Sequence, residues 1–427
     1  MKQYDSYKDS GVEWIGEVPS HWEVMPLKFT GTFGNGLTYS PKDVVDNGIL
    51  VLRSSNIQNS SLSFEDNVYV SNVSKALLVQ KGEVIICSRN GSAALVGKSA
   101  FIDKDINATF GAFMMRYIPK INKKYGFYLF QTAIGRYKGY FATTTINQLT
   151  KSTIGEMKVP LANTEEQNAM VTYLDKKCSE IDKVISAQQK RIALLQELKQ
   201  SVITHAVTKG LNPNVEMKDS GVEWIGEVPK HWEVAPIKRY VNIFTGNTPS
   251  TQEERYYNSE DINWFTPGDF YKDSLNESNK KISEISRKEN ACRIFPPKSV
   301  YMIGIGGTIG KIATCKEEAS ANQQINIIVP NTNTDYKYLA YCMRCQKEEI
   351  ILSANVVTLP IINQDKTGYL SMPHPQKGEQ NSIADYLDKK CTSIDSSISK
   401  AQHQVELLQE YKQSLITEVV TGKRKVC

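Results

Sequence analysis

The feature that most constrains this chain is an internal repeat. Residues 8–24 read KDSGVEWIGEVPSHWEV and residues 218–234 read KDSGVEWIGEVPKHWEV, so the two stretches differ only at Ser20 and Lys230. Residues 173–178 and 386–391 both read YLDKKC, at an offset of 213. Because repeated sequence folds into repeated structure, the 427 residues predict two similar units rather than one large core.

Each unit has a repeated opening, a body that has diverged and a repeated closing segment. Within the bodies only isolated residues still align, for example Gly91 with Gly304. The repeat predicts a first globular domain, a helical region, a second globular domain and a second helical region. Their predicted boundaries are 1–160, 161–217, 218–373 and 374–427.

The closing segments predict two long helices. Residues 165–209 and 379–421 contain no glycine or proline. Thr164 and Gln167 have the spacing of a capping box, in which the threonine caps a backbone amide and the glutamine reaches back. At about 1.5 Å per residue the first helix would be about 65–70 Å long, which suits a spacer better than a core helix.

Apolar residues recur along both segments at alternating steps of three and four, interrupted by Gln188, Lys199 and Lys412. This heptad pattern is typical of a coiled-coil seam. A lone helix would expose the seam, so we expect the two copies to pack together; packing of each helix on its own globular unit is the alternative. The predicted seam is Leu174, Ile181, Ile185, Ile192, Leu195, Val202, Leu387, Ile394, Ile398, Val405, Leu408 and Leu415.

The bodies differ from the helices in composition. Short apolar runs rich in β-branched residues, such as 83–87, 111–117 and 324–329, are separated by stretches rich in Gly, Asn, Ser and Thr. Such runs indicate strands joined by loops. The expected fold class is therefore mixed α+β: two α/β globular domains joined by two long helices, with an internal pseudo-twofold repeat.

Composition narrows the class of protein without naming a function. Hydrophobic residues make up 40% of the chain, which is typical of a globular protein. The polar start and the lack of long apolar runs argue against a signal peptide or membrane span. Eight cysteines are too few for a disulfide scaffold in a chain of this length, so we expect a cytoplasmic protein.

Catalytic and cofactor motifs fail on their spacing. The segment 304–311 reads GIGGTIGK, but a phosphate-binding loop would need Ser or Thr at position 312, which is Ile. Cys342 and Cys345 form one CxxC pair without the second pair that a structural zinc site needs. We therefore expect no catalytic residue, no metal site and no cofactor in this chain.

Three blocks together carry a resemblance to a known family. They are the opening GVEWIGEVPxHWEV, the helix start containing YLDKKCxxID and the helix end LLQExKQSxIT, each present twice. In these blocks the chain resembles the specificity subunits of type I restriction–modification systems, and the resemblance covers the whole chain.

The resemblance implies fold, partners and function. Such subunits hold two target-recognition domains on an antiparallel pair of conserved helices, and each domain reads one half of a bipartite DNA target. Two methyltransferase subunits, which use S-adenosylmethionine, and restriction subunits, which use ATP and Mg, assemble around the specificity subunit. The specificity subunit itself catalyses nothing. Because the two bodies here are unlike, we expect an asymmetric target.

The residues expected to contact DNA are polar side chains in loops that follow strand-like runs. Arg, Lys, Asn and Gln can form paired hydrogen bonds with base edges in the major groove. A role as a loop cap or structural hydrogen bond is the alternative for each of them. The predicted set is Arg53, Ser55, Asn56, Arg89, Asn90, Lys98, Asn147 and Gln148 in the first body, and Thr266, Asp269, Thr308, Lys311, Gln323, Asn363 and Gln364 in the second.

Two further functions remain open from the sequence. One is a coiled-coil scaffold that does not touch DNA, and the other is a standalone restriction or methylation enzyme. The formal net charge of +5 is small for a DNA-binding protein of this size, because neutralisation of phosphates dominates the affinity of most such proteins. We therefore expect partner methyltransferases to supply much of the grip on DNA.

Overall fold

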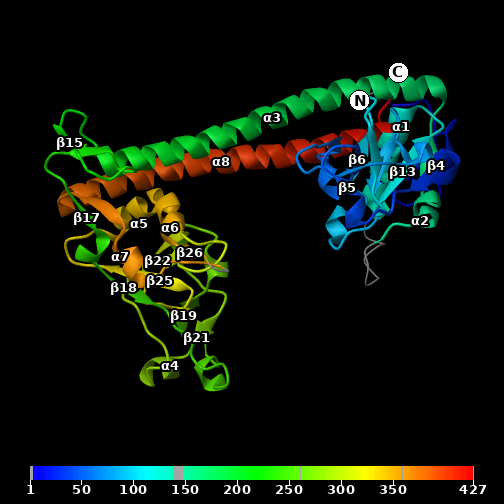
Figure 1. Ribbon diagram of the computed structural model, residues 1–427. Helices are drawn as coiled ribbons and strands as arrows, with labels where there is room; N and C mark the ends of the chain where they lie inside the picture. The colour runs from blue at the N-terminus through cyan, green and yellow to red at the C-terminus, as the bar shows by residue number, and fades with distance from the viewer. Residues whose placement is uncertain (1–2, 138–147, 260, 357–358, 427) are drawn as a thin grey trace. The chain divides into compact units, whose positions relative to one another are not determined.

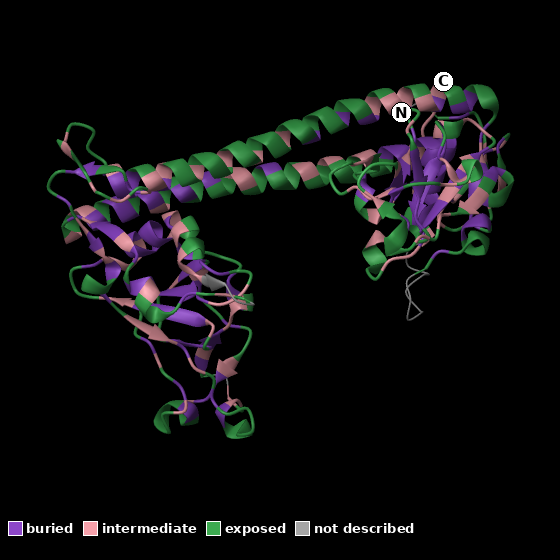
Figure 2. Cartoon of the chain, in the orientation of Figure 1, coloured by how far each residue is buried: buried purple, intermediate pink, exposed green. Residues whose placement is uncertain are grey.

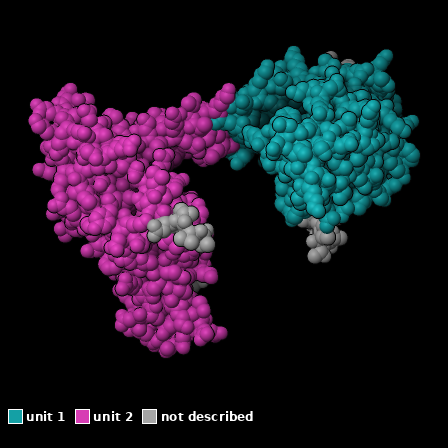
Figure 3. Space-filling view, in the orientation of Figure 1, with its two compact units in different colours: residues 1–189, 403–427 teal, residues 190–402 magenta. Residues whose placement is uncertain are grey.

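The computed structural model describes residues 3–137, 148–259, 261–356 and 359–426. Its contacts divide the chain into two compact units, drawn in separate colours in Figure 3. Unit 1 comprises residues 1–189 and 403–427, and unit 2 comprises residues 190–402. Each unit therefore contains part of both long helices. None of the helices in the described part of the chain combines the length and hydropathy that a membrane span requires.

The first half of the chain runs through an opening of three short strands and a sheet-rich body into a 46-residue helix (Figure 1). In chain order its elements are β1 (Tyr7–Asp9), β2 (Glu17–Pro19), β3 (Glu23–Pro26), β4 (Gly31–Asn35), β5 (Val44–Val45), β6 (Ile49–Leu52), β7 (Ile57–Gln58), β8 (Ser61–Leu62), β9 (Tyr69–Val70), β10 (Val84–Cys87), β11 (Ser99–Phe101), β12 (Ala108–Phe110), β13 (Met114–Pro119), α1 (Lys123–Tyr137), α2 (Lys151–Gly155), β14 (Lys158–Leu161) and α3 (Thr164–Lys209).

The second half repeats this order and ends in a 44-residue helix. Its elements are β15 (Met217–Asp219), β16 (Glu227–Pro229), β17 (Glu233–Pro236), β18 (Val241–Thr245), β19 (Ile262–Phe265), β20 (Ser274–Leu275), β21 (Lys281–Ile282), α4 (Glu284–Lys288), β22 (Ser299–Ile303), β23 (Ile312–Cys315), β24 (Ser320–Ala321), β25 (Ile325–Pro330), α5 (Tyr336–Cys345), α6 (Lys347–Ser353), β26 (Asn355–Val356), β27 (Pro360–Ile361), α7 (Gln364–Gly368), β28 (Ser371–His374) and α8 (Lys377–Val420).

Each body is built around a mostly antiparallel sheet with a wholly buried strand inside it. In the first body the strand order is β11-β10-β13-β4, and in the second it is β18-β25-β22-β23-β20. All four residues of β10 and all five of β22 are buried (Figure 2). Continuous apolar runs of this kind form strands that are covered on both faces. The mixed α+β fold predicted from the sequence is confirmed.

The repeat extends to strand register. β14 pairs antiparallel with β3, with Pro160 opposite Val24, and β28 pairs antiparallel with β17, with Pro373 opposite Val234. These two ribbons join the opening of each half to the strand that precedes its long helix. In both halves, therefore, the diverged body is attached to the same framework of chain connections and backbone hydrogen bonds.

The two long helices pack together, as the heptad seam predicts. In unit 1, Leu174 and Ile181 of α3 share a buried cluster with Leu415 and Val419 of α8. In unit 2 the cluster joins the end of α3 to the start of α8, through Ile203, Val207, Ile383 and Leu387. The start of one helix therefore packs on the end of the other, which makes the pair antiparallel. Between these clusters, Ile192, Leu195 and Ile398 are only half-buried.

The two lysines that interrupt the seam form ion pairs between the helices. In unit 1, Lys412 Nζ lies 2.7 Å from the Asp182 carboxylate, and in unit 2, Lys199 Nζ lies 2.8 Å from the Asp395 carboxylate. Both pairs sit at equivalent positions of the repeat. The lysine stems cover apolar surface while the charged ends reach a partner, so these positions belong to the helix interface.

The start of α3 differs from the predicted capping box. Asn163, not Thr164, caps the helix: its Oδ1 accepts a hydrogen bond from the Glu166 amide at 2.9 Å. Gln167 Nε2 donates to the Ala162 carbonyl at 2.8 Å, and its Oε1 accepts from the Asn122 amide at 3.0 Å. The box is thus shifted by one residue, to Asn163 and Glu166, and the Asn163 amide donates to Glu166 Oε2 at 3.4 Å.

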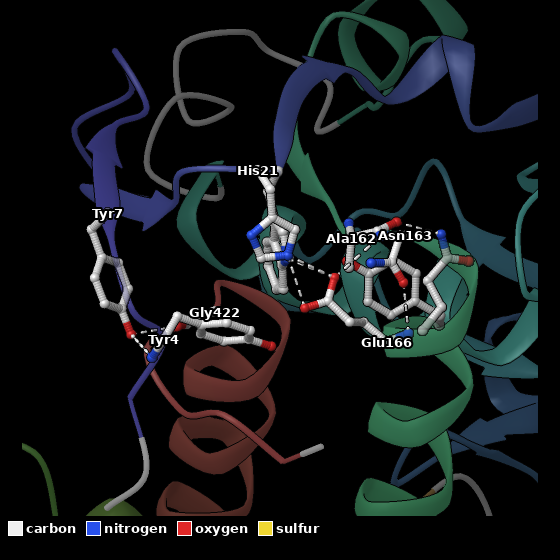
Figure 4. Close-up of polar contacts among 10 residues, drawn as sticks. Tyr4, Tyr7, His21, Ala162, Asn163, Glu166 and Gly422 are labelled. Carbon is white, nitrogen blue, oxygen red and sulfur yellow. Dashed lines mark hydrogen bonds and ion pairs between the residues drawn. The ribbon is translucent and has the colours of Figure 1, made fainter.

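The repeated opening docks onto the ends of both helices in unit 1 (Figure 4). The buried Glu166 carboxylate accepts hydrogen bonds from His21 Nε2 and from Trp22 Nε1, each at 3.0 Å. At the end of α8, the Tyr7 hydroxyl donates to the Gly422 carbonyl at 3.2 Å. Gly422 has φ +76°, and a Cβ there would lie 2.3 Å from the Pro19 ring. Glycine is therefore required both for the helix end and for the close packing.

Unit 2 repeats this arrangement with fewer bonds, and the position of Tyr7 is taken by Met217, which has no hydroxyl group. His231 Nε2 lies 3.0 Å from Glu379 at the start of α8, and Gly210, with φ +75°, ends α3 beside the Trp232 ring. Trp232 Nε1 is buried and has no hydrogen-bond partner among the described residues. Glu379 is also more exposed, at 32% of its side chain against 10% for Glu166.

This difference predicts unequal stability costs for two equivalent substitutions. Glu166→Ala should lower the free energy of unfolding by about 2–3 kcal/mol, because it leaves the buried Trp22 Nε1 unpaired. Glu379→Ala should cost about 1 kcal/mol or less, because only a partly exposed pair is lost. Urea unfolding of the two variants measures both values, and equal costs would contradict this account of the openings.

Candidate nucleic-acid interface

The first predicted loop of one body and the first predicted loop of the other occupy equivalent places. Arg53 follows β6 and begins a short turn, η3 (Ser54–Asn56), while Thr266 follows β19 and begins η9 (Pro267–Asp269). In each turn the side chain of the last residue accepts a hydrogen bond from the first. Asn56 Oδ1 bonds the Arg53 amide at 3.0 Å, and Asp269 Oδ2 bonds the Thr266 amide at 2.7 Å.

Asn56 and Asp269 therefore hold their loops together. Asn56 is fully buried, and its Nδ2 donates to the carbonyls of Ser63 and Asp66, each at 3.1 Å. Asp269 is 2% exposed, and its second carboxylate oxygen accepts two hydrogen bonds from Asn279. Since these polar atoms are already paired, they are structural groups rather than groups free to meet a base.

Four other predicted residues meet at one cleft in unit 1. Arg53, Ser55, Arg89 and Asn90 line a cleft of about 990 Å³ whose wall is largely apolar. The remaining lining residues are Leu37, Thr38, Tyr39, Pro41, Val44, Ser54, Val68, Gly91, Gly111, Ala112, Phe113 and Met114. Two arginines beside an apolar wall can donate several hydrogen bonds in a place where bulk water is partly excluded.

The two arginines of this cleft are held differently. Arg53 lies 2.8 Å from the exposed Asp66 carboxylate, and the Ser55 hydroxyl together with Arg53 keeps the pKa of Asp66 below its usual range. Arg89 has no ion pair among the described residues. Its guanidinium lies 5.3 Å from the centre of the Phe113 ring, which is 60% exposed. Of the two arginines, Arg89 is therefore the one without an acidic partner among the described residues, and the face of an aromatic ring orients its guanidinium.

The other predicted residues of the first body lie at or beyond the edge of the cleft. Gln148 is exposed and forms an isolated strand bridge with Arg89. Lys98 is half-buried and is not among the lining residues. Within the cleft itself, Asn90 Nδ2 donates to the Ser54 hydroxyl at 3.3 Å. Asn147 lies outside the described residues.

In unit 2 the predicted residues form a less compact set. Thr308 and Lys311 lie on the turn between β22 and β23, which bonds to the segment before Asn363: the Ile362 amide donates to the Gly304 carbonyl at 2.9 Å. Asn363 caps α7, and Gln364 Nε2 donates to Thr245 at 2.9 Å. Gln323 bonds with Thr248 instead. All five side chains are exposed.

The structure also places residues at these surfaces that the sequence reasoning did not single out. Phe113 lies in the first cleft, and Arg344 and Lys347 line a second pocket of about 310 Å³ together with Lys311. The sequence does contain a signal for Arg344 and Lys347. At offset 213 they align with Gln131 and Ile134, so these two positive charges are present in one repeat only. Phe113 sits in an apolar run and gave no comparable signal.

A family profile decides what kind of chain this is. The profile described as "Type I restriction modification DNA specificity domain" matches residues 19–193 and again residues 229–407. The chain belongs to this family. The two matches coincide with the two repeats, each including most of one body and part of one long helix.

Relatives and a solved structure agree with this assignment. The chain is 29% identical over 191 residues to the MjaIX specificity subunit of a type I restriction enzyme from Methanocaldococcus jannaschii, covering 44% of this chain and 43% of that protein. It is 23% identical to the MjaVIII specificity subunit of the same organism, covering 84% and 83%. A chain in a solved structure described as a type I R-M system has the same fold, with TM-score 0.69, 14% identity, and coverage of 94% and 98%.

The paired loops predict which of two neighbouring residues matters for folding. Asn56→Ala should lower the free energy of unfolding by about 2–3 kcal/mol, because it leaves a buried amide and two carbonyls without their partner. Ser55→Ala, at an exposed position one residue away, should change it by less than about 0.5 kcal/mol. Chemical denaturation measures both, and a mild effect of Asn56→Ala would return that residue to the set of possible base contacts.

Proposed function

We propose that this chain reads an asymmetric bipartite DNA target, with one body on each half-site, and directs methyltransferase and restriction subunits to it. The observation that carries the proposal is the contrast between framework and loops. Residues repeated in both halves are used in structural bonds, such as His21 with Glu166 and His231 with Glu379. The loops at the strand ends carry different residues in the two bodies. A constant framework with unlike loops suits two readers of unlike sequences.

The chemistry of the two surfaces supports different half-sites. Arginine donates two hydrogen bonds to guanine O6 and N7, and the cleft of unit 1 presents Arg53 and Arg89. At the end of the corresponding region of unit 2, the exposed predicted residues are Asn363, which caps α7, and Gln364, which bonds Thr245, and neither is an arginine. We therefore expect the half-site of the first body to contain guanine at a required position.

In this proposal the chain is not an enzyme. S-adenosylmethionine, ATP and Mg act in the partner subunits, and the role belongs in the cytoplasm, where the DNA is. The domains at 1–160 and 218–373 are the readers, and the helical regions at 161–217 and 374–427 hold them. A scaffold that does not touch DNA and a standalone enzyme remain as outcomes that the experiments below would reveal.

Exposed apolar residues on the helices support two equivalent partner copies. On α3, Leu194 and Leu198 are 64% and 49% exposed; on α8, Leu407 and Tyr411 are 50% and 51% exposed. The pairs are related by the offset of 213, and each pair lies one helical turn apart on one face. One pair belongs to unit 2 and the other to unit 1. Two copies of one methyltransferase subunit would meet the same apolar pair twice.

A substitution in the cleft tests the reading function. Arg89→Ala should relax one required base in a single half of the methylated sequence, with a loss of discrimination of about 1–3 kcal/mol, and leave the other half unchanged. Sequencing of methylated adenines in a host carrying the variant measures this. Arg287→Ala is the matched control, since Arg287 is an exposed arginine paired with Glu318 at 3.1 Å. An unchanged methylated sequence would show that Arg89 does not read a base. Methylation of DNA by the isolated chain would show that the chain is an enzyme.

A second substitution tests the partner surfaces. Leu407→Asp should remove one of the two methyltransferase copies, and Leu194→Asp together with Leu407→Asp should remove both, because a charge would be buried at each contact. Native mass spectrometry of the purified assembly counts the copies. Ser186→Asp, at an exposed polar position of α3, is the control. Two retained copies in the double variant would place the partners elsewhere.

A further inference from the structure

A second pocket, in unit 2, carries an excess of positive charge that the framework does not explain. It has a volume of about 310 Å³ and lies between the turn around Asp273, the turn that ends at Lys311, and the junction of α5 and α6. Its charged lining residues are Lys272, Asp273, Lys311, Arg344 and Lys347, which we call the basic pocket. Four cations thus surround a single carboxylate.

The carboxylate of Asp273, whose side chain is 62% exposed, has two cations of the fold within 4 Å. Arg344 Nη2 donates to the Asp273 carbonyl at 3.0 Å, and Arg344 Nη1 lies 3.6 Å from the Asp273 carboxylate. Lys199 of α3 lies 3.9 Å from the same carboxylate. The guanidinium is also positioned over the Tyr341 ring, 5.3 Å from its centre. Arg344 and Asp273 therefore form a fixed wall of the pocket.

The three lysines of the basic pocket remain uncompensated. Lys272, Lys311 and Lys347 are all exposed, and none of them has an ion pair among the described residues. Lys311 Nζ reaches only the Phe270 carbonyl, at 3.5 Å. Lys272 lies 6.0 Å from the centre of the Tyr271 ring, which is itself 70% exposed. Like charges gathered around one hollow repel each other until an anion enters.

The equivalent place in unit 1 is nearly neutral. At offset 213 the positions of Lys272, Asp273, Arg344 and Lys347 are Asn59, Ser60, Gln131 and Ile134, and only Lys311 keeps a lysine, at Lys98. Unit 1 keeps a contact at the positions equivalent to Arg344 and Asp273, but between uncharged side chains. Gln131 Nε2 donates to the Ser60 hydroxyl at 2.7 Å, where unit 2 has Arg344 with Asp273. The basic pocket is therefore a feature of one body and not of the shared framework.

We propose that the basic pocket binds a phosphodiester group of the DNA backbone beside the half-site read by the second body. This proposal rests on the proposed function. Lysine ammonium groups neutralise backbone phosphates, and an exposed aromatic ring such as Tyr271 offers a surface for a sugar or base. Because unit 1 lacks the equivalent charges, only the second body makes this contact. The pocket is a local concentration of positive charge, since residues 218–373 as a whole contain 18 basic and 19 acidic residues.

The test is the salt dependence of DNA binding by the full chain. The variant Lys272→Gln, Lys311→Gln, Lys347→Gln is compared with wild type by fluorescence anisotropy, using a random-sequence DNA duplex between roughly 50 and 200 mM KCl. Loss of one phosphate contact should reduce the slope of log Kd against log salt concentration by about 0.9 and weaken binding on the order of tenfold at 0.1 M salt.

A matched control removes the same charge from the same unit. Lys280, Lys288 and Lys316 are exposed lysines outside the basic pocket, and their replacement by glutamine should change the slope little. If both variants have the same thermal midpoint as wild type, the substitutions do not affect folding. If the triple variant unfolds early, the single substitution Lys272→Gln replaces it, with a smaller change of slope in the same direction.

The outcomes separate this proposal from the proposed function. If neither the wild-type chain nor its assembly with the methyltransferase subunits binds the duplex, both are overturned. If wild type binds and the two triple variants lose affinity equally, or neither changes the slope, only the phosphate anchor is overturned. Inorganic phosphate provides a further arm: if it raises the thermal midpoint of wild type but not of the pocket variant, while DNA binding is unchanged between them, the pocket takes free phosphate and the DNA assignment fails.

Discussion

The interaction on which the rest of the structure depends is the docking of each opening onto two helix ends. In unit 1, Trp22 and His21 bond Glu166 at the start of α3, while Gly422 at the end of α8 packs on Pro19. Each body is thereby fixed to the beginning of one helix and the end of the other. A change at Pro19, His21 or Trp22 would disturb a helix start, a helix end and the ribbon to β14 together, and these three residues are the same in both halves.

Much of the architecture followed from the sequence because it is written there twice. The helices, the seam and the strand-like runs each rest on periodicity or repetition, and α3 and α8 span almost the ranges expected. The structure corrected the details that depend on geometry between distant segments. Thr164 has the right spacing for a cap, but Asn163 takes that position, and the side chain of Gln167 bonds the residue before α1 instead. Lys199 and Lys412 looked like faults in the seam until their carboxylate partners were placed.

Candidate site residues were harder to predict, for a physical reason. A polar residue in a loop after a strand can face a ligand or hold the loop, and both uses favour the same residue types. Asn56 and Asp269 close their turns with the side chain, whereas Arg89 is left in the cleft beside Phe113. Only the fold distinguishes them. Comparing the repeats with each other carries more information, since charges present in one half alone, such as Arg344, stand outside the common framework.

The division of the helices between the units has a consequence for the order of folding. Unit 2 is one continuous stretch, residues 190–402, whereas unit 1 needs residues 403–427 as well as 1–189. On the ribosome, the second unit can close as soon as its own residues have emerged, while the first must wait with an incomplete core until Leu415 and Val419 arrive. Contacts between Tyr7 and Gly422 span 415 positions, so this closure carries a large loop entropy. The half of the protein that is made first is thus expected to be finished last.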